Sequence, residues 1–110
     1  MTTFTPTRLY QGQPGAGSTT LYSAPASTSV ILKEVLICNT SGSPATVSVF
    51  LVPGGATQAA GNALVNNFQV APNATLVQAM NQIMNSGDEL TGQQGTGSAI
   101  TLTISGVTMQ

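Results

Sequence analysis

The chain has 110 residues, 41% of them hydrophobic, which is enough to bury one core and too little for two ordinary domains. Only two basic and three acidic residues carry charge, histidine is absent, and the net charge is -1. Two cations cannot neutralise a run of phosphates, and two Tyr and three Phe offer few surfaces for base stacking, so no nucleic-acid partner is expected. No apolar run approaches the ~20 residues of a membrane span, so no membrane partner is expected.

The first residues carry neither the basic end nor the apolar run of a secretory signal. The sequence therefore predicts synthesis in a cytoplasm-like compartment. Glycosylation patterns begin at Asn39 and at Asn73, and without a secretory signal both are interpreted as chance matches.

Alternation of apolar and polar residues with a period of two recurs along the chain and predicts about eight β-strands. In chain order they are residues 3–10, 19–23, 28–39, 46–52, 63–70, 74–80, 88–93 and 98–105. The segments between them contain Gly, Pro, Ser and Asn, the residues that turns require. This spacing favours an all-β fold, a single-domain antiparallel β-sandwich of jelly-roll-like form. The domain covers residues 1–110, and residues 1–10 form either an N-terminal arm or an edge strand.

The predicted strand 28–39 is apolar on both faces. Such a strand is expected to be central in its sheet, with its second face covered by a loop, the N-terminal arm or another subunit. Strict alternation places Val30, Leu32, Leu36 and Cys38 on one face and Ile31, Val35 and Ile37 on the other.

Two other strands have one clearly apolar face. In 46–52 this face carries Val47, Val49 and Leu51. In 98–105 it carries Ile100, Leu102 and Ile104, and hydroxyl-bearing residues occupy the opposite face, as in a sandwich strand with one wet side.

Residues 80–85 are ambiguous between strand and helix. Leu76, Met80, Ile83 and Met84 also fit a helical stripe that Gly87 would end. Because the flanking residues favour β-structure, we expect a strand that closes with a single helical turn before Gly87.

The sequence predicts no catalytic residues, no cofactor and no metal, and therefore no enzyme. Without histidine neither a Ser-His-Asp nor a Cys-His arrangement can be built. Asp88 and Glu89 are the only neighbouring carboxylates; in a strand they diverge, and the spaced acidic ligands of a calcium loop are missing. The single cysteine, Cys38, cannot form an internal disulfide and is expected to be an inert thiol within an apolar strand.

A surface made of neutral hydroxyls and amides does not repel neighbouring copies, so the composition favours association. Tyr10 and Tyr22 are either interface anchors or strand-end residues with their hydroxyls in water. Arg8 either lies along the surface or forms an ion pair with an acid of another subunit. The predicted interface residues are Phe4, Arg8, Tyr10, Tyr22, Ile31, Val35 and Ile37.

Several segments resemble a known group of proteins. They are LYQG at 9–12, TLYSAPA at 20–26, the apolar run 30–40 ending in Asn-Thr, GDEL at 87–90 and AITLTISG at 99–106. Together they resemble small β-sandwich virion structural proteins of tailed bacteriophages, and the resemblance covers nearly the whole chain. The stretch 80–84 departs from that pattern. The resemblance implies attachment to a virus particle and brings no catalytic residues with it.

The hypothesis that follows is a capsid decoration or cement protein, bound to the outer shell at capsomer junctions. Its implied partners are further copies of itself, with a trimer favoured, and the major capsid protein. It would be made in the host cytoplasm and lie on the outer surface of the virion. The alternative is a neck, tail or baseplate accessory protein, including a module that binds host carbohydrate. The absence of Trp and the presence of only two Tyr disfavour carbohydrate binding.

Overall fold

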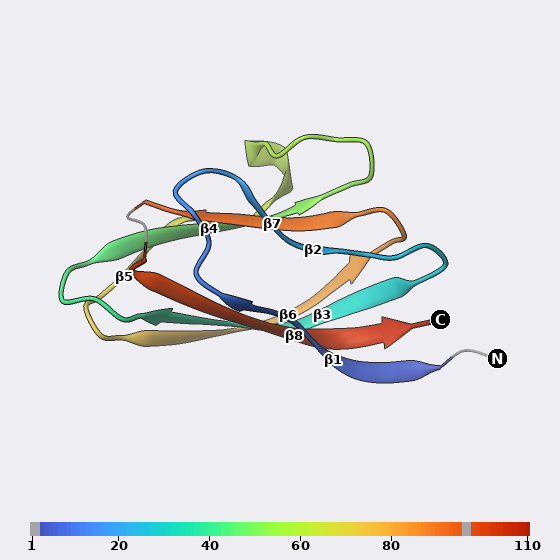
Figure 1. Cartoon of the computed structure of the whole chain (residues 1–110), viewed down its shortest axis with the longest axis horizontal. Coiled ribbons are helices and arrows are strands. Elements are labelled where there is room, and N and C mark those ends of the chain that lie inside the picture. The colour runs from blue at the N-terminus through green and yellow to red at the C-terminus, as the bar shows by residue number, and fades with distance from the viewer. Residues whose placement is uncertain (1–2, 96–97) are drawn as a thin grey trace.

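The computed structural model describes residues 3–95 and 98–110. They form two four-stranded antiparallel sheets packed face to face (Figure 1). In spatial order, sheet A contains β1 (Phe4–Gly12), β8 (Ile100–Met109), β3 (Ser29–Asn39) and β6 (Thr75–Met84). Sheet B contains β2 (Thr19–Ser23), β7 (Glu89–Gln94), β4 (Ala45–Val52) and β5 (Ala63–Val70), and a short 3-10 turn, η1 (Ala60–Asn62), precedes β5. The predicted antiparallel β-sandwich is confirmed.

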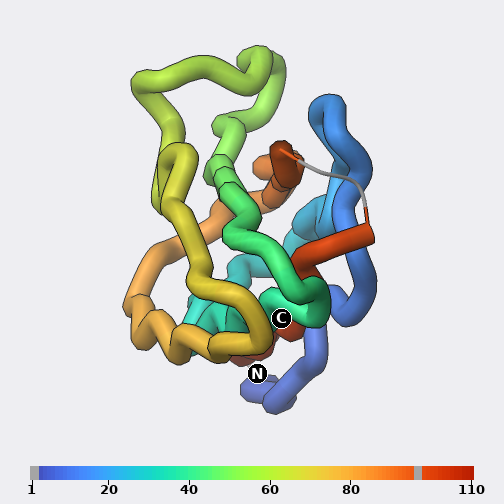
Figure 2. The backbone as a smooth tube through the Cα atoms, turned by 90° about the vertical axis from the view of Figure 1, so that its left-hand side faces the viewer, coloured from blue at the N-terminus to red at the C-terminus, as the bar shows by residue number. Residues whose placement is uncertain are grey.

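Consecutive strands change sheet at every step except from β4 to β5, which are neighbours in sheet B. This order is that of a jelly roll, in which strands distant in sequence pair within two packed sheets. Each sheet has two edges. Figure 2 shows the edge strands β5 and β6 on one side of the molecule, in olive to orange, and the blue β1 and β2 on the other.

The core lies between the sheets and is built from aliphatic side chains. The predicted inward set of β8, Ile100, Leu102 and Ile104, is wholly buried, and Val47 and Val49 of β4 oppose it from sheet B. Water is excluded from this layer because each strand turns its apolar side inward, and that burial supplies most of the driving force for folding.

A β-bulge at Lys33 interrupts the alternation of β3. Leu32 pairs with Gly106 of β8, but the next pairing is Glu34 with Ser105, so Lys33 is an extra residue. An extra residue reverses the phase of the side chains that follow it. Lys33 and Glu34 are consequently both exposed.

The bulge corrects the prediction for this strand. Val30 and Leu32 before it and Val35 and Ile37 after it all point into the core, each with 0% of its surface exposed. Leu36, expected on the same face as Leu32, instead lies half-buried on the outer face.

Gly106 of β8 lies between Thr7 of β1 and Leu32 of β3. A Cβ atom at this position would overlap the backbone carbonyl oxygen of Ile31 and lie 3.2 Å from Cδ1 of Leu9. Leu9 belongs to a register shift in β1, as Lys33 does in β3. The missing side chain therefore lets two irregular strands pack against β8.

Strand β6 does not end in a helical turn, which corrects the prediction for residues 80–85. Its pairing with β3 continues to Met84, opposite Val30, and Met84 is wholly buried. A helical turn would remove Met84 from the core and its backbone from the sheet. The turn comes later, where Asp88 N–H donates to the Asn85 carbonyl at 3.0 Å and Gly87 has a φ of 87°.

Two buried amide side chains connect the turns at one end of the sandwich. Asn39 donates to the carbonyls of Ser43 (2.8 Å) and Val70 (3.1 Å) and accepts from the N–H of Ser41 (3.0 Å). Gln94 accepts from the N–H groups of Ala99 and Ile100, and donates to the Pro14 carbonyl. The burial of Asn39 also places its glycosylation pattern out of reach in the folded chain.

The outer face of sheet B is covered by the chain itself. Residues 53–62 pass over it, as the upper part of Figure 1 shows. Gln58 of this loop donates to the side-chain oxygen of Gln93 at 2.9 Å and accepts from the Thr91 hydroxyl. Phe50, on the same face of β4, is 6% exposed. Among the residues that the structure describes, no loop crosses the outer face of sheet A, so this face is open to a partner (Figure 1).

Candidate interaction surfaces

The ionisable residues are dispersed. Asp88 has a structural position: one carboxylate oxygen accepts from the N–H of Gly54 and the other from the N–H of Asn85, both at 2.9 Å. Lys33 donates to the side-chain oxygen of Asn81 at 2.9 Å. Within residues 3–95 and 98–110 no three His, Cys, Asp or Glu residues lie together in a way that could hold a metal ion. The surfaces to consider are therefore those that could bind another macromolecule.

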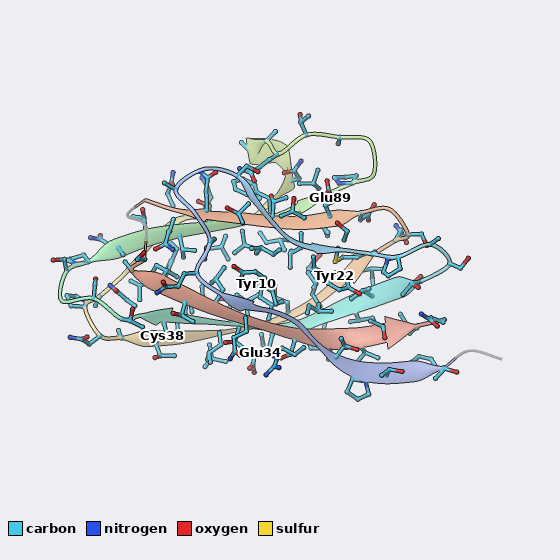
Figure 3. The ribbon with its side chains drawn as sticks, viewed as in Figure 1. Tyr10, Tyr22, Glu34, Cys38 and Glu89 are labelled. Atoms are coloured by element: carbon cyan, nitrogen blue, oxygen red, sulfur yellow. The ribbon has the colours of Figure 1, made fainter. Side chains whose placement is uncertain are left out.

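The predicted interface residues separate into three groups. Phe4, which is 64% exposed, Arg8 and the half-buried Ile31 lie on the outer face of sheet A. Tyr10 and Tyr22 are half-buried and pack against the core, and Figure 3 shows them between the two layers.

Val35 and Ile37 cannot contact a partner, because both are wholly buried between the sheets. Their inclusion among the interface residues is wrong for the same reason as the placement of Leu36: the bulge at Lys33 reverses the alternation.

An apolar row crosses the outer face of sheet A. Val107 of β8 lies opposite both Pro6 of β1 and Ile31 of β3. Ile31 in turn lies opposite Ile83 of β6, which is 50% exposed. The row therefore spans all four strands, and it is the most continuous apolar feature on this face.

The neighbouring row is polar. Ser105 lies between Arg8 of β1 and Glu34 of β3, and Ala79 of β6 completes the row. Figure 3 shows Glu34 on the outer side of sheet A, with Cys38 further along the same strand. Arg8 and Glu34 are both exposed and are separated by the whole width of β8.

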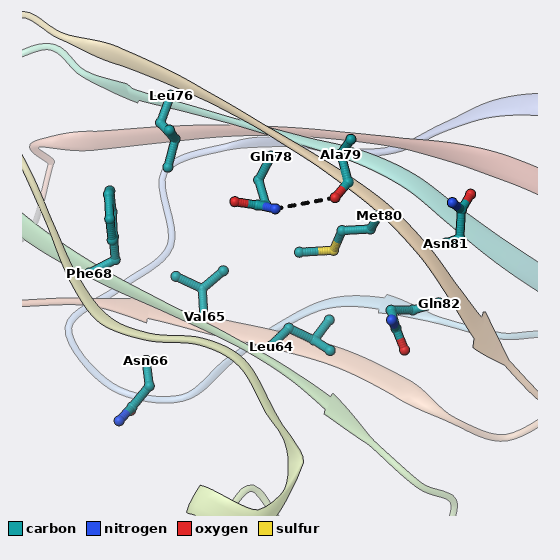
Figure 4. A pocket seen from close by; sticks show the side chains of 10 residues that line it. All are labelled: Leu64, Val65, Asn66, Phe68, Leu76, Gln78, Ala79, Met80, Asn81 and Gln82. Carbon is teal, nitrogen blue, oxygen red and sulfur yellow. Dashed lines mark hydrogen bonds between the residues drawn. The ribbon is translucent and has the colours of Figure 1, made fainter.

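A cleft of about 710 Å³ opens between the edge strands β5 and β6. Its apolar lining consists of Leu64, Val65 and Phe68 from β5 and Leu76 and Met80 from β6, which point toward one another in Figure 4. These side chains belong to the inner faces of the two sheets. The cleft is thus the place where the core of the sandwich meets solvent.

The four edge strands differ in how well they are protected against pairing with another chain. Proline interrupts β1 at Pro6, and β2 has only five residues. In β5 the register shifts twice, and Asn67, with a φ of 48°, donates its backbone N–H to the Ser48 hydroxyl. By contrast, β6 has ten residues, no proline, no charged side chain and a single register shift, between Ala79 and Gln82. It is the least protected edge. The sequence alone does not identify this edge, because the position of a strand at an edge depends on the strand order of the folded sheet.

No helix in the described part of the chain is long and apolar enough to cross a membrane. The strand order and the buried inter-sheet core define an eight-stranded jelly-roll sandwich. No protein-family model matches the sequence, and no curated protein matches it significantly.

Solved structures share this fold across almost the whole chain. A chain of the T13 particle of infectious bursal disease virus matches with a TM-score of 0.57 and 14% identity, over 99% of this chain and 30% of that one. The VP2 subviral particle of the same virus matches with a TM-score of 0.56 and 12% identity, over 98% of this chain and 32% of that one. A chain of the disulfide-linked pili of Bacillus endospore appendages matches with a TM-score of 0.55 and 16% identity, over 99% of this chain and 88% of that one. The protein spans about a third of the viral chains and most of the pilus chain.

Proposed function

We propose that this protein is a structural component of a virus particle, and specifically a bacteriophage capsid decoration protein that binds the outer shell at capsomer junctions. The observation that carries the proposal is the fold: the whole chain superposes on one part of a chain that builds a viral particle, with 99% of its length covered. The bacteriophage assignment comes from the resemblance of segments such as 9–12 and 20–26 to tailed-phage virion proteins.

Attachment would proceed through apolar contact and backbone pairing. The apolar row of Pro6, Val107, Ile31 and Ile83 gives sheet A a face that can be buried against a shell protein. The partners would be the major capsid protein and further copies of the chain, and occupation of three-fold junctions would require a trimer. The protein would be made in the host cytoplasm, act without catalysis and remain on the outer surface of the virion.

A second candidate is an accessory protein of the neck, tail or baseplate, including a host-binding module. The match to the endospore pilus chain favours it, because there a domain of this size makes up 88% of the matched chain instead of a third. Such a domain can be the repeating unit of an appendage.

Copy number distinguishes the two candidates. Quantitative mass spectrometry of purified virions should give hundreds of copies per particle for a decoration protein. A low copy number that is a multiple of six or twelve would support the neck or tail instead. Absence of the protein from purified particles would overturn both.

A further inference from the structure

We infer that β6 is a self-pairing edge: two copies of the chain join their β6 strands in antiparallel register about a two-fold axis at Met80. Sheet A of one copy then continues into sheet A of the other. The occupant of this edge is thus a second copy of the same protein. The inference concerns the free protein in solution, for which it gives a dimer in place of the trimer proposed for three-fold junctions, and its test needs no virus particle.

The sequence of β6 from Leu76 to Met84 is largely mirrored about Met80 in the character of its residues. In an antiparallel pair centred on Met80, each residue faces the residue at the mirrored position of the other copy, as a two-fold interface requires. The mirrored pairs are Leu76 with Met84, Val77 with Ile83, Gln78 with Gln82, and Ala79 with Asn81. Three of the four pairs match in kind, with two apolar pairs and one pair of glutamines, and only Ala79 with Asn81 differs.

The two exposed aliphatic residues of β6 form one of these pairs. Val77 is 56% exposed and Ile83 is 50% exposed, both on the outer face of sheet A. In the proposed register Val77 of each copy lies across from Ile83 of the other, so each of the four side chains covers part of the apolar surface of its neighbour. Cross-strand aliphatic pairs of this kind are a main source of sheet stability.

A register shift at the centre of β6 is compatible with this pairing. Between Ala79 and Gln82 the strand has one more residue than the facing part of β3. This irregularity falls at the proposed axis and leaves a regular arm on each side. Each arm then pairs with the opposite arm of the second copy.

The cleft beside β6 gives a second reason for a partner at this edge. Leu76 and Met80 line it from β6, and Leu64, Val65 and Phe68 line it from β5 (Figure 4). A second β6 placed alongside the first brings its own inner face, with the same apolar residues, to the mouth of the cleft. The β5–β6 cleft of each copy is therefore covered by the β6 strand of the other.

A charge-introducing variant tests the interface. Wild-type protein should sediment as a dimer over a concentration series from micromolar to millimolar. In Val77→Glu/Ile83→Glu, each new carboxylate faces another across the axis, so the variant should be monomeric. Phe4→Glu places one such carboxylate on a still more exposed residue at the far edge of the same sheet and should remain dimeric. Circular dichroism should show the same β-signal in all three.

Disulfide trapping tests the register, in a Cys38→Ser background. Val77→Cys/Ile83→Cys should form a covalent dimer on oxidation because positions 77 and 83 face each other. Either cysteine alone should not, since its own position on the other copy is several residues away along the strand. A wild-type monomer at every concentration, a trimer, a Glu variant that stays dimeric, or equal cross-linking by the single cysteines would each overturn the inference.

Discussion

At the scale of single residues, the buried amides do most to hold the turns. Asn39 has 0% of its surface exposed, yet its donors and its acceptor are all engaged by the turns before β4 and β6. The Ser43 and Ala71 carbonyls each have a second donor, but the bond from the Asn39 amide to the Val70 carbonyl is buried. Removal of the amide would therefore leave buried polar groups unsatisfied.

Asn39→Ala should lower the free energy of unfolding by about 2–4 kcal/mol, the cost of leaving buried donors and acceptors without partners. Equilibrium urea unfolding at fixed protein concentration measures it. Asn66→Ala is the matched control: Asn66 is exposed, and its truncation should change stability by less than about 0.5 kcal/mol. Equal losses in the two variants would show that the Asn39 network contributes nothing.

The sequence could not reveal these roles. From the sequence alone, Asn39 is indistinguishable from an ordinary turn residue after an apolar strand. Gln94 likewise resembles any polar residue at the end of a strand. Their partners lie as far as 80 residues away, as in the bond from Gln94 to the Pro14 carbonyl, and are brought close by the topology.

At the scale of elements, β3 shows what the alternation of apolar and polar residues predicts correctly and what it does not. The pattern of apolar residues predicted a central strand over 28–39, and the strand spans Ser29–Asn39 between β8 and β6. The pattern failed within the strand because it assumes a constant phase. The bulge at Lys33 appears in the pairing with both β8 and β6, and the only local mark of it is the consecutive charged pair Lys33 and Glu34.

Leu32→Ala and Leu36→Ala make the same chemical change on opposite sides of the bulge. Leu32 is wholly buried, so its truncation should cost about 2–5 kcal/mol. Leu36 is half-buried on the outer face, and its truncation should cost about 1 kcal/mol or less. Urea midpoints at constant m-value provide the comparison. Similar losses for the two variants would mean that strict alternation, without a bulge, describes β3.

The prediction for the end of β6 was wrong for a different reason. Its Leu and Met spacing satisfies both a helix and a strand, and only the long-range pairing of Met84 with Val30 decides between them. Short apolar segments carry this ambiguity because periodicity alone cannot separate the two structures.

At the scale of the whole molecule, the small number of charges determines how the surface can bind. The positions of the strands and the sandwich class followed from the sequence, but the strand order and the location of the edges did not. Composition predicts contact through apolar and backbone groups, since two basic and three acidic residues leave few ion pairs to form.

Attachment to particles should therefore be nearly independent of salt. We expect the fraction of protein bound to purified capsids to be unchanged between about 0.1 M and about 1 M NaCl, a range over which exposed ion pairs are strongly screened. Pelleting of particles through a cushion, with quantification of the bound protein, measures it. Release at the low end of this range would mean that charged groups dominate the contact.

The pairing of β1 with β8 has a consequence for how the chain folds. Apart from β4 and β5, no neighbouring strands within a sheet are consecutive in sequence, and β8 supplies the partner of both β1 and β3. Sheet A therefore cannot be completed until residues 100–109 have left the ribosome. Chains dominated by such distant contacts fold slowly, in roughly milliseconds to seconds. Until then the growing polypeptide carries unpaired β-edges and is vulnerable to aggregation.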